Sequence, residues 1–431
     1  MSDELFDDLN RQASGAPETG PARYETANRR QVELTPTDLD GLLPPGHAAR
    51  LVWRFVEGLD LEAFYRQIKA REGGPGRTPI DPKILVALWL YATIDGVGSA
   101  REVDRLCYAH DAYRWLRGGV PVNYHTLSDF RVAHQAALDD LLTQSIAALL
   151  DRQVVTLHRL AQDGTKVRAN AGVRSFRRGE RLRDCLTMAR QQVARAQLHA
   201  DGAIPAREAA ATQRAADERL ARVEEALAQL PAVEAVKRRN KSKAVPKVST
   251  TDPDARVMKM SDGGFRPAYN VQFITDVEAH AIVGVAVTNT GSDQHEVGPM
   301  LDQVRRRTGR APTDVLADGG YVNTATLVQT AADGITFYGP VPKGDHGPGS
   351  GTAPALPAVQ AWRTRMATDE AKTIYKARAA TAERINADTR RHRGLTEMPV
   401  RGLPKISTWV LWIALAHNMM RAMAIVPHLM T

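Results

Sequence analysis

The chain has 431 residues, 43% of them hydrophobic and 25% charged, which is enough for two or three globular domains. Its two isolated cysteines exclude a disulfide framework and a zinc module, and its acidic first residues lack the apolar stretch of a signal peptide. The net charge of +8 is uneven, because residues 1–150 contain 16 Lys and Arg against 21 Asp and Glu, whereas residues 151–431 contain 41 against 28. We expect a reduced cytoplasmic protein with no membrane contact, whose last two thirds either bind nucleic acid or form a solvated basic surface.

The first part of the chain predicts a tail followed by helices. Residues 1–45 are polar and acidic, and they predict a flexible tail. Residues 46–150 predict a compact helical module, since their apolar residues recur at helical spacing. Either Asn123 or Thr126 can cap a helix that runs through Arg131. The other helices are expected over residues 49–56, 61–70, 83–94 and 100–107.

A β-rich run follows over residues 153–163 and predicts a strand that ends on Asp163, just before a glycine. Residues 177–240 are rich in charged helix formers and predict a helical hairpin that Pro205 and Pro231 interrupt. A basic cluster between residues 237 and 247 follows this hairpin. Contact with DNA and a solvated linker are equally compatible with that cluster.

The remaining residues alternate between strands and helices. Strands are expected over residues 269–276, 281–288, 313–318 and 336–338, and helices over 296–308, 322–332, 358–391 and 407–425, with a loop at 344–357. This order predicts an α/β fold: an RNase H-like mixed sheet flanked by helices, with a helical insertion after the first strand and an all-helical N-terminal module. The predicted domains are a tail (1–45), a helical DNA-binding module (46–150), a catalytic domain (151–176 and 248–431) and an insertion with a basic linker (177–247).

Three acidic residues are candidates for a metal centre. Asp163 and Asp318 share a local pattern in which a β-rich run ends on an aspartate followed by glycine, and Glu383 lies in a predicted helix 65 positions after Asp318. Three carboxylates suit hard cations such as Mg²⁺. The spacing alone is a weak signal among 49 acidic residues, and Asp252 and Asp254 compete for the second position.

Ordered motifs make the interpretation more specific. They are Asp-Gly-Thr-Lys at 163–166, Asp-Pro-Asp-Ala-Arg at 252–256, Tyr-Asn-Val-Gln at 269–272, Ala-Asp-Gly-Gly-Tyr at 317–321 and Tyr-Lys-Ala-Arg at 375–378. With these motifs the chain resembles the DDE-type transposases of bacterial insertion sequences, which belong to the retroviral-integrase superfamily. The resemblance implies an RNase H-like catalytic domain, two Mg²⁺ ions that Mn²⁺ can replace, and catalytic, metal-binding carboxylates at Asp163, Asp318 and Glu383.

The family's signature helix is matched with one departure. Tyr375 and Arg378 keep their spacing, but Glu383 follows Arg378 by five positions rather than four, and Arg390 stands where a lysine is expected. The resemblance implies DNA contacts for Tyr375, Arg378 and Arg390; for Arg378 an internal ion pair is the alternative.

Further DNA contacts are predicted outside this helix. Lys166, three residues after Asp163, is a candidate for the scissile phosphate. His125 and Arg131 lie in the helix expected to recognise the terminal inverted repeats, and Lys241 and Lys243 belong to the basic cluster.

The predicted function is metal-dependent cleavage at the ends of a transposable element, followed by strand transfer into target DNA. The partners implied are double-stranded DNA, comprising inverted repeats and target, and a second copy of the chain, since synapsis needs at least a dimer; the bacterial nucleoid is the expected location. The alternatives are an RNase H-like nuclease without joining activity and a non-catalytic DNA-binding protein derived from a transposase.

Overall fold

A computed structural model describes residues 38–70, 78–199, 205–342, 348 and 356–425, together with Ala27, Arg30 and Val32. Residues from Leu39 onward form one unit by their contacts, separate from residues 1–38. Most of the predicted tail lies outside the described residues. Its end is part of the folded unit, however, since η2 (Asp40–Leu42) is a short 3-10 helix and Leu43 is buried in the core.

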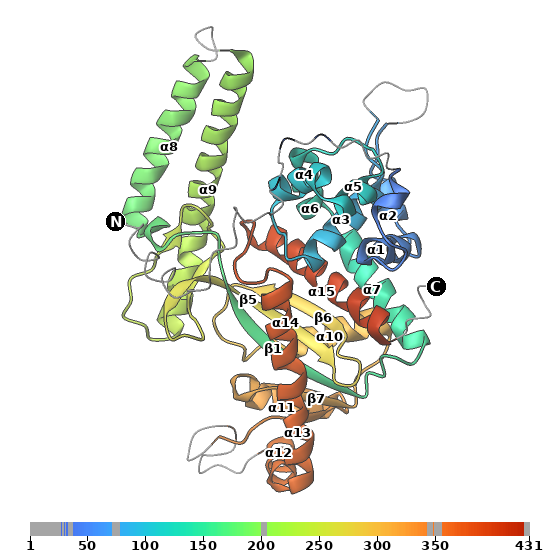
Figure 1. Cartoon of the computed structure of the whole chain (residues 1–431). Coiled ribbons are helices and arrows are strands. Elements are labelled where there is room, and N and C mark those ends of the chain that lie inside the picture. The colour runs from blue at the N-terminus through green and yellow to red at the C-terminus, as the bar shows by residue number, and fades with distance from the viewer. Residues whose placement is uncertain are drawn as a thin grey trace, which may run out of the picture. The chain divides into compact units, whose positions relative to one another are not determined.

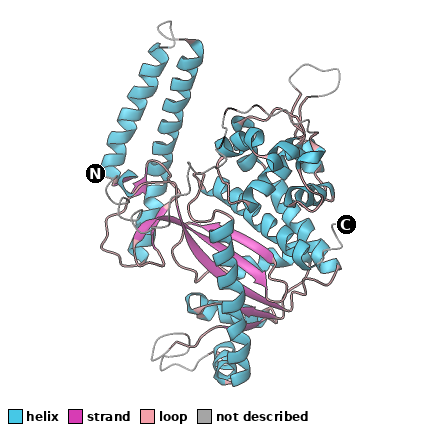
Figure 2. Ribbon diagram, in the orientation of Figure 1, coloured by secondary structure: helices cyan, strands magenta, loops and turns pink. Residues whose placement is uncertain are grey.

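A mixed sheet forms the centre of this unit (Figure 2). Its strands follow the order β6–β5–β1–β7–β8, and β4 pairs with the first residues of β5. β1 is antiparallel to β5 and parallel to β7, and β7 is parallel to β8. This is the strand order of the RNase H-like fold, so the predicted fold class is confirmed. The strands are β1 (Arg159–Arg168), β4 (Arg256–Lys259), β5 (Phe265–Asp276), β6 (Ile282–Thr288), β7 (Asp314–Leu316) and β8 (Thr336–Tyr338).

The N-terminal helices share one hydrophobic core with the sheet. The link is α15 (Leu403–Ile425), an apolar helix that contacts α3, α6, α7 and β6. Asn123 caps α6 through the backbone N–H of Thr126, at 3.0 Å, as one of the two predicted caps. The helix predicted over residues 61–70 covers only Glu62–Tyr65. The helices are α1 (Ala48–Glu57), α2 (Glu62–Tyr65), α3 (Pro82–Ile94), α4 (Ala100–Ala109), α5 (Asp111–Arg117), α6 (Tyr124–Ala133) and α7 (Gln135–Asp151).

The insertion after β1 is a pair of long helices, α8 (Gly179–His199) and α9 (Ala206–Arg239), which contact each other (Figure 1). A two-stranded ribbon, β2 (Phe176–Arg177) with β3 (Val248–Ser249), joins the start of the insertion to its end. The predicted interruption at Pro231 is wrong, because α9 continues through it. Leu230 and Val233, on either side, are buried in the insertion's own core, and this packing offsets the backbone hydrogen bond that proline removes.

Strand β1 also differs from its prediction. It covers Arg159–Arg168, so Asp163 lies in the middle of the strand and not at its end. β1 continues through Gly164 without a turn. A larger residue does not fit at this position, because its Cβ would lie 2.3 Å from Nε2 of Gln272. The glycine therefore leaves space over β1 for the side chains of Gln272, Asn270 and Asp293, and it is not a turn.

The helix predicted over residues 358–391 is three helices and a π-turn. α12 (Pro357–Ala367) ends at Thr368, whose hydroxyl caps α13 (Asp369–Arg378). The π-turn η5 (Ala379–Glu383) joins α13 to α14 (Arg384–His392), and this column crosses β1 and β5 (Figure 1). The remaining helices are η3 (Val173–Ser175), α10 (Val297–Thr308), η4 (Gly319–Tyr321) and α11 (Thr324–Ala332). Among the described residues, no helix has the length and apolarity to cross a membrane.

Candidate active site

Asp163 lies in β1, and Asp318 lies two residues after the end of β7, the parallel strand beside β1. Ala161 of β1 pairs with Leu316 of β7, and each aspartate is two residues beyond its paired residue in the same strand direction. The carboxylate of Asp318 accepts the backbone N–H of Gly320 at 2.7 Å, which starts η4. The sheet register therefore brings together two acidic residues that are 155 positions apart in the sequence.

Asp163 is partly buried and surrounded by polar groups. Its Oδ1 accepts the N–H of Gly164 at 3.0 Å, and its Oδ2 accepts Nδ2 of Asn386 at 2.9 Å. Burial raises the pKa of Asp163 to about 6; Arg378 opposes this shift, and the charges of Asp318 and Asp293 add to it. The main cause of the raised pKa is the loss of hydration on burial, to which the charges of the neighbouring aspartates add a smaller effect.

Asp293 is an acidic neighbour that sequence reasoning missed. It lies between β6 and α10, and its Oδ1 accepts Nδ2 of Asn270 and Nε2 of Gln272, each at 2.7 Å. Both amides belong to β5 and are fully buried. The sequence carries no strong signal for Asp293, because it stands in a loop without a neighbouring glycine motif.

Glu383 stands apart from the aspartates. It ends the π-turn, its side chain is 61% exposed, and its Oε1 accepts Nη2 of Arg378 at 3.1 Å. A π-turn places residues i and i+5 in succession along the helix, so the extra position between Arg378 and Glu383 is absorbed as a local bulge. Arg378 also lies 3.8 Å from Oδ2 of Asp163 and over the ring of Tyr375. In this conformation Arg378 forms the internal ion pair that sequence analysis named as its alternative role.

A cavity of about 540 Å³ opens beside Asp163 and Glu383, and its lining includes Lys166, Lys259 and Arg390. Arg390 donates to the hydroxyl of Thr165 and, at 3.1 Å, to the backbone carbonyl of Lys166. It therefore ties α14 to β1 at the floor of the cavity. Three basic side chains next to two acidic ones give the cavity a polar rim suited to a phosphodiester.

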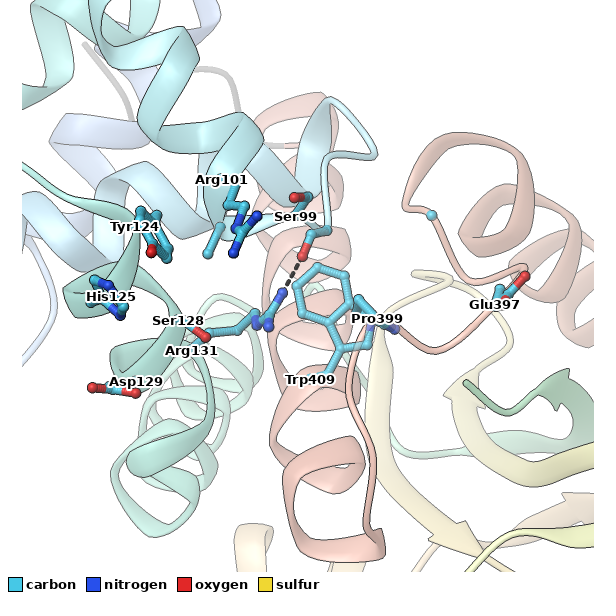
Figure 3. Close-up of a pocket in the computed structure, with 13 residues that line it drawn as sticks. Ser99, Arg101, Tyr124, His125, Ser128, Asp129, Arg131, Glu397, Pro399 and Trp409 are labelled. Carbon is cyan, nitrogen blue, oxygen red and sulfur yellow. Dashed lines mark hydrogen bonds between the residues drawn. The ribbon is translucent and has the colours of Figure 1, made fainter. Parts of the chain in front are cut away.

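The predicted recognition helix α6 borders another cavity, of about 610 Å³ (Figure 3). His125 is exposed and stacks against Tyr124, with ring centroids 4.0 Å apart. Arg131 is buried, donates to the carbonyl of Gly98 and lies over the ring of Trp89. The guanidinium of Arg131 thus supports the packing between helices. Because this side chain is buried, it is not accessible for the predicted DNA contact.

The other predicted residues lie at different places in the unit. Lys241 and Lys243 are exposed just after α9. Asp252 accepts the hydroxyl of Tyr269 at 2.7 Å and the N–H of Gly402 at 3.2 Å, and Asp254 accepts the N–H of Leu403 at 2.8 Å. These two rivals for the second carboxylate therefore hold the start of α15.

Two family models match the chain. One, described as a transposase DDE domain, covers residues 214–419, and the other, described as a transposase domain, covers residues 37–133; together they cover more than half of the sequence. The chain belongs to the DDE transposases. Asp293, Asp318 and Glu383 lie inside the matched DDE segment, whereas β1 with Asp163 lies outside both segments. Comparison with curated proteins and with solved structures gives no match.

DDE transposases generally use divalent metal ions. Among the residues that the structure describes, no three His, Cys, Asp or Glu side chains are grouped closely enough to hold a metal ion as they stand. The donors around Asp163 nevertheless fit such an ion, since carboxylate and amide oxygens are its preferred ligands. Oδ1 of Asn386, whose Nδ2 donates to Asp163, is a buried oxygen without a hydrogen-bond partner among the described residues, so an amide oxygen lies beside the Asp163 carboxylate.

Proposed function

We propose that this transposase cleaves DNA at the ends of its element and joins the freed 3′ ends to target DNA. Asp163, Asp318 and Glu383 are its catalytic carboxylates in this proposal. The observation that carries it is the register between β1 and β7, which sets two aspartates side by side at the centre of an RNase H-like sheet. Family membership supports a transposase function and leaves the individual steps to experiment.

In the proposed mechanism Asp163 and Asp318 hold divalent cations, two Mg²⁺ ions or Mn²⁺ in their place. When bound, such ions supply Lewis-acid stabilisation of the attacking and leaving oxygens of a phosphodiester. Asn386 keeps Asp163 oriented through its hydrogen bond to Oδ2. The raised pKa of Asp163 leaves this carboxylate mostly ionised near neutral pH, as ligation requires.

Arg378 and Glu383 change partners in this mechanism. A DNA phosphate at the cavity competes for Arg378, because a guanidinium binds phosphate oxygens in the same bidentate way as a carboxylate. Release of Arg378 frees Glu383 to turn toward the aspartates. The exposure of Glu383 supports this exchange, since its side chain can rotate without disturbing the core.

The remaining DNA contacts are also proposals. Lys166 and Arg390 line the cavity beside Asp163, and Tyr375 lies against Arg378. Lys241 and Lys243 would bind phosphates further along the duplex, like the other basic residues through sequence-independent attraction. His125 on α6 is the candidate for contact with the inverted repeats. Pairing of two ends requires two copies of the chain, and a chromosomal substrate places the reaction in the bacterial nucleoid.

A strand-transfer assay with pre-cut element ends tests the proposal. We expect joined products with the wild-type protein and Mg²⁺, and none with Asp318→Asn. Hydrolysis without joining would instead favour an RNase H-like nuclease. Binding of the ends with neither reaction would favour a non-catalytic protein derived from a transposase.

A further inference from the structure

We propose that a basic cavity between α14 and α15 binds a phosphate group, carried either by DNA or by a free phosphate anion. The cavity has a volume of about 190 Å³, several times the roughly 30 Å³ that one water molecule occupies, so a tetrahedral oxyanion fits. The inference stands without the proposed function, which assigns no role to this cavity. Its charged and polar lining residues are His280, Arg384, Asp388, Arg393, His417 and Arg421.

The basic cavity lies on the opposite face of α14 from the active site. Asn386 and Arg390 line the cavity beside Asp163, whereas Arg384 and Asp388 line the basic cavity. Successive residues of a helix are about 100° apart around its axis, so these two pairs of side chains point in nearly opposite directions. The two cavities share no lining residue, and they are therefore separate sites.

Positive charge is in excess in the basic cavity. Three guanidinium groups and one carboxylate line it, which leaves two positive charges unmatched. The carboxylate of Asp388 lies 3.3 Å from Nδ1 of His417 and 3.8 Å from Nε of Arg393, so its charge is balanced within the protein. Arg384 and Arg421 form no ion pair with a carboxylate among the described residues. An anion is the ligand that such a lining attracts.

Arg384 and Arg421 also have hydrogen-bond donors to spare. The side chain of Arg384 is exposed and bonds to no described residue. Arg421 donates from Nε to the carbonyl of Ala279 at 3.0 Å, and its two terminal nitrogens bond to no described residue. A guanidinium presents its N–H groups in a planar fork that matches the spacing of phosphate oxygens. The unused donors of two arginines thus suit a phosphate group.

The cationic groups of the basic cavity are close enough to influence one another. Burial is the first cause that lowers the pKa of Arg421, and the charge of Arg384 is the second. Burial also lowers the pKa of His280, and the charges of Arg421 and Arg384 add to this effect. A bound anion would relieve this repulsion, so phosphate binding should be favourable at neutral pH.

Calorimetric titration of the full-length protein with inorganic phosphate at constant ionic strength tests the inference. We expect saturable binding to the wild type and about tenfold weaker binding to Arg384→Gln, because hydrogen bonds to charged groups are lost. The matched control is Arg391→Gln, which removes the same charge from an exposed residue of α14 outside the cavity, and it should bind phosphate as the wild type does. Equal binding by Arg384→Gln and the wild type, or no saturable binding to the wild type, would overturn the inference.

Two further variants establish where the phosphate binds. Arg421→Gln changes the other helix that lines the basic cavity, and it should weaken phosphate binding as Arg384→Gln does. Arg390→Gln changes the active-site cavity and should leave phosphate binding unchanged. Binding that is lost in Arg390→Gln and kept in both other variants would place the phosphate in the active site, which would overturn the inference.

DNA binding distinguishes the two sources of the phosphate group, with fluorescence anisotropy of a labelled duplex as the measurement. If the cavity takes a backbone phosphate, Arg384→Gln weakens duplex binding more than Arg391→Gln does, and inorganic phosphate competes with the duplex. If the cavity takes a free anion, the two variants bind the duplex equally, and phosphate at constant ionic strength leaves that binding unchanged.

Discussion

The acidic residues of the sheet and the acidic residue of the helical column are held in different ways. Asp163 and Asp318 extend from adjacent strands whose register cannot shift without exposing buried side chains. Glu383 ends a π-turn and is exposed, with Arg378 as its partner. In the proposed mechanism the sheet therefore provides a permanent part of the centre, while the helix provides a part that responds to DNA. Four expected outcomes test this contrast, in order of decreasing effect.

The sheet carboxylates should be indispensable for chemistry. We expect Asp163→Asn and Asp318→Asn each to reduce cleavage of element ends by about 1,000-fold or more, because each removes a charged metal ligand. Gel analysis of end-containing duplexes with Mg²⁺ measures the rate, and Asp302→Asn, which removes an exposed carboxylate of α10, is the control. Activity within about tenfold of the wild type in either variant would contradict the site.

The packing of side chains over Gly164 should be sensitive to the addition of one methyl group at this position. Gly164→Ala places a Cβ 2.3 Å from Nε2 of Gln272, so we expect the free energy of unfolding to fall by about 1–3 kcal/mol, with loss of Mn²⁺ binding. Denaturant unfolding measures the first effect. Gly172→Ala is the matched control, since nothing lies within 4 Å of its added Cβ. Equal stability of the two variants would show that the side chain of Gln272 can move away from the added Cβ without a loss of stability.

The helix should matter more for DNA than for stability. Arg378→Ala removes an ion pair with the exposed Glu383 and a longer one, at 3.8 Å, with Asp163, so we expect about 1 kcal/mol of lost stability. Affinity for element ends should fall about tenfold, and the salt dependence of binding should lose about one phosphate contact. Lys376→Ala, an exposed neighbour in α13, is the control. An unchanged affinity for element ends would show that Arg378 acts only in its ion pairs within the protein.

The smallest effect is expected furthest from the sheet carboxylates. Replacing Lys241 and Lys243 together with alanine should weaken DNA binding a few-fold and reduce the salt dependence by at most about two phosphate contacts. Binding measured by fluorescence anisotropy at several salt concentrations gives both quantities. The double alanine variant of Arg214 and Arg219, both exposed on α9, is the comparison. Equal losses in both pairs would indicate a diffuse charge effect and no local contact.

Local patterns were sufficient to predict the elements but not their ends. The aspartate–glycine pattern identified Asp163 and Asp318, yet it predicted a turn at Gly164, where β1 continues to Arg168. A glycine required by a neighbouring strand has the same sequence signature as a glycine in a turn. Pro231 similarly predicted a break that packing of α9 prevents.

The site could be predicted only in part for the same reason. Asp293 has no motif, and its proximity to Asp163 depends on Asn270 and Gln272 of β5. Arg131 was predicted as a DNA contact because it lies in the candidate recognition helix, yet tertiary packing buries it over Trp89. The domain boundaries, the DNA sequence that the protein recognises at the transposon ends, and the oligomeric state stay predictions.

By itself the sequence determined the order of strands and helices, the insertion after β1 and the resemblance to DDE transposases, because these depend on local periodicity and short motifs. The five-residue spacing between Arg378 and Glu383 was also visible there. Only the tertiary structure decided that a π-turn absorbs this spacing, that Glu383 pairs with Arg378, and that Asn386 donates a hydrogen bond to Asp163. These are contacts between segments distant in sequence, set by strand register and core packing, and no local pattern records them.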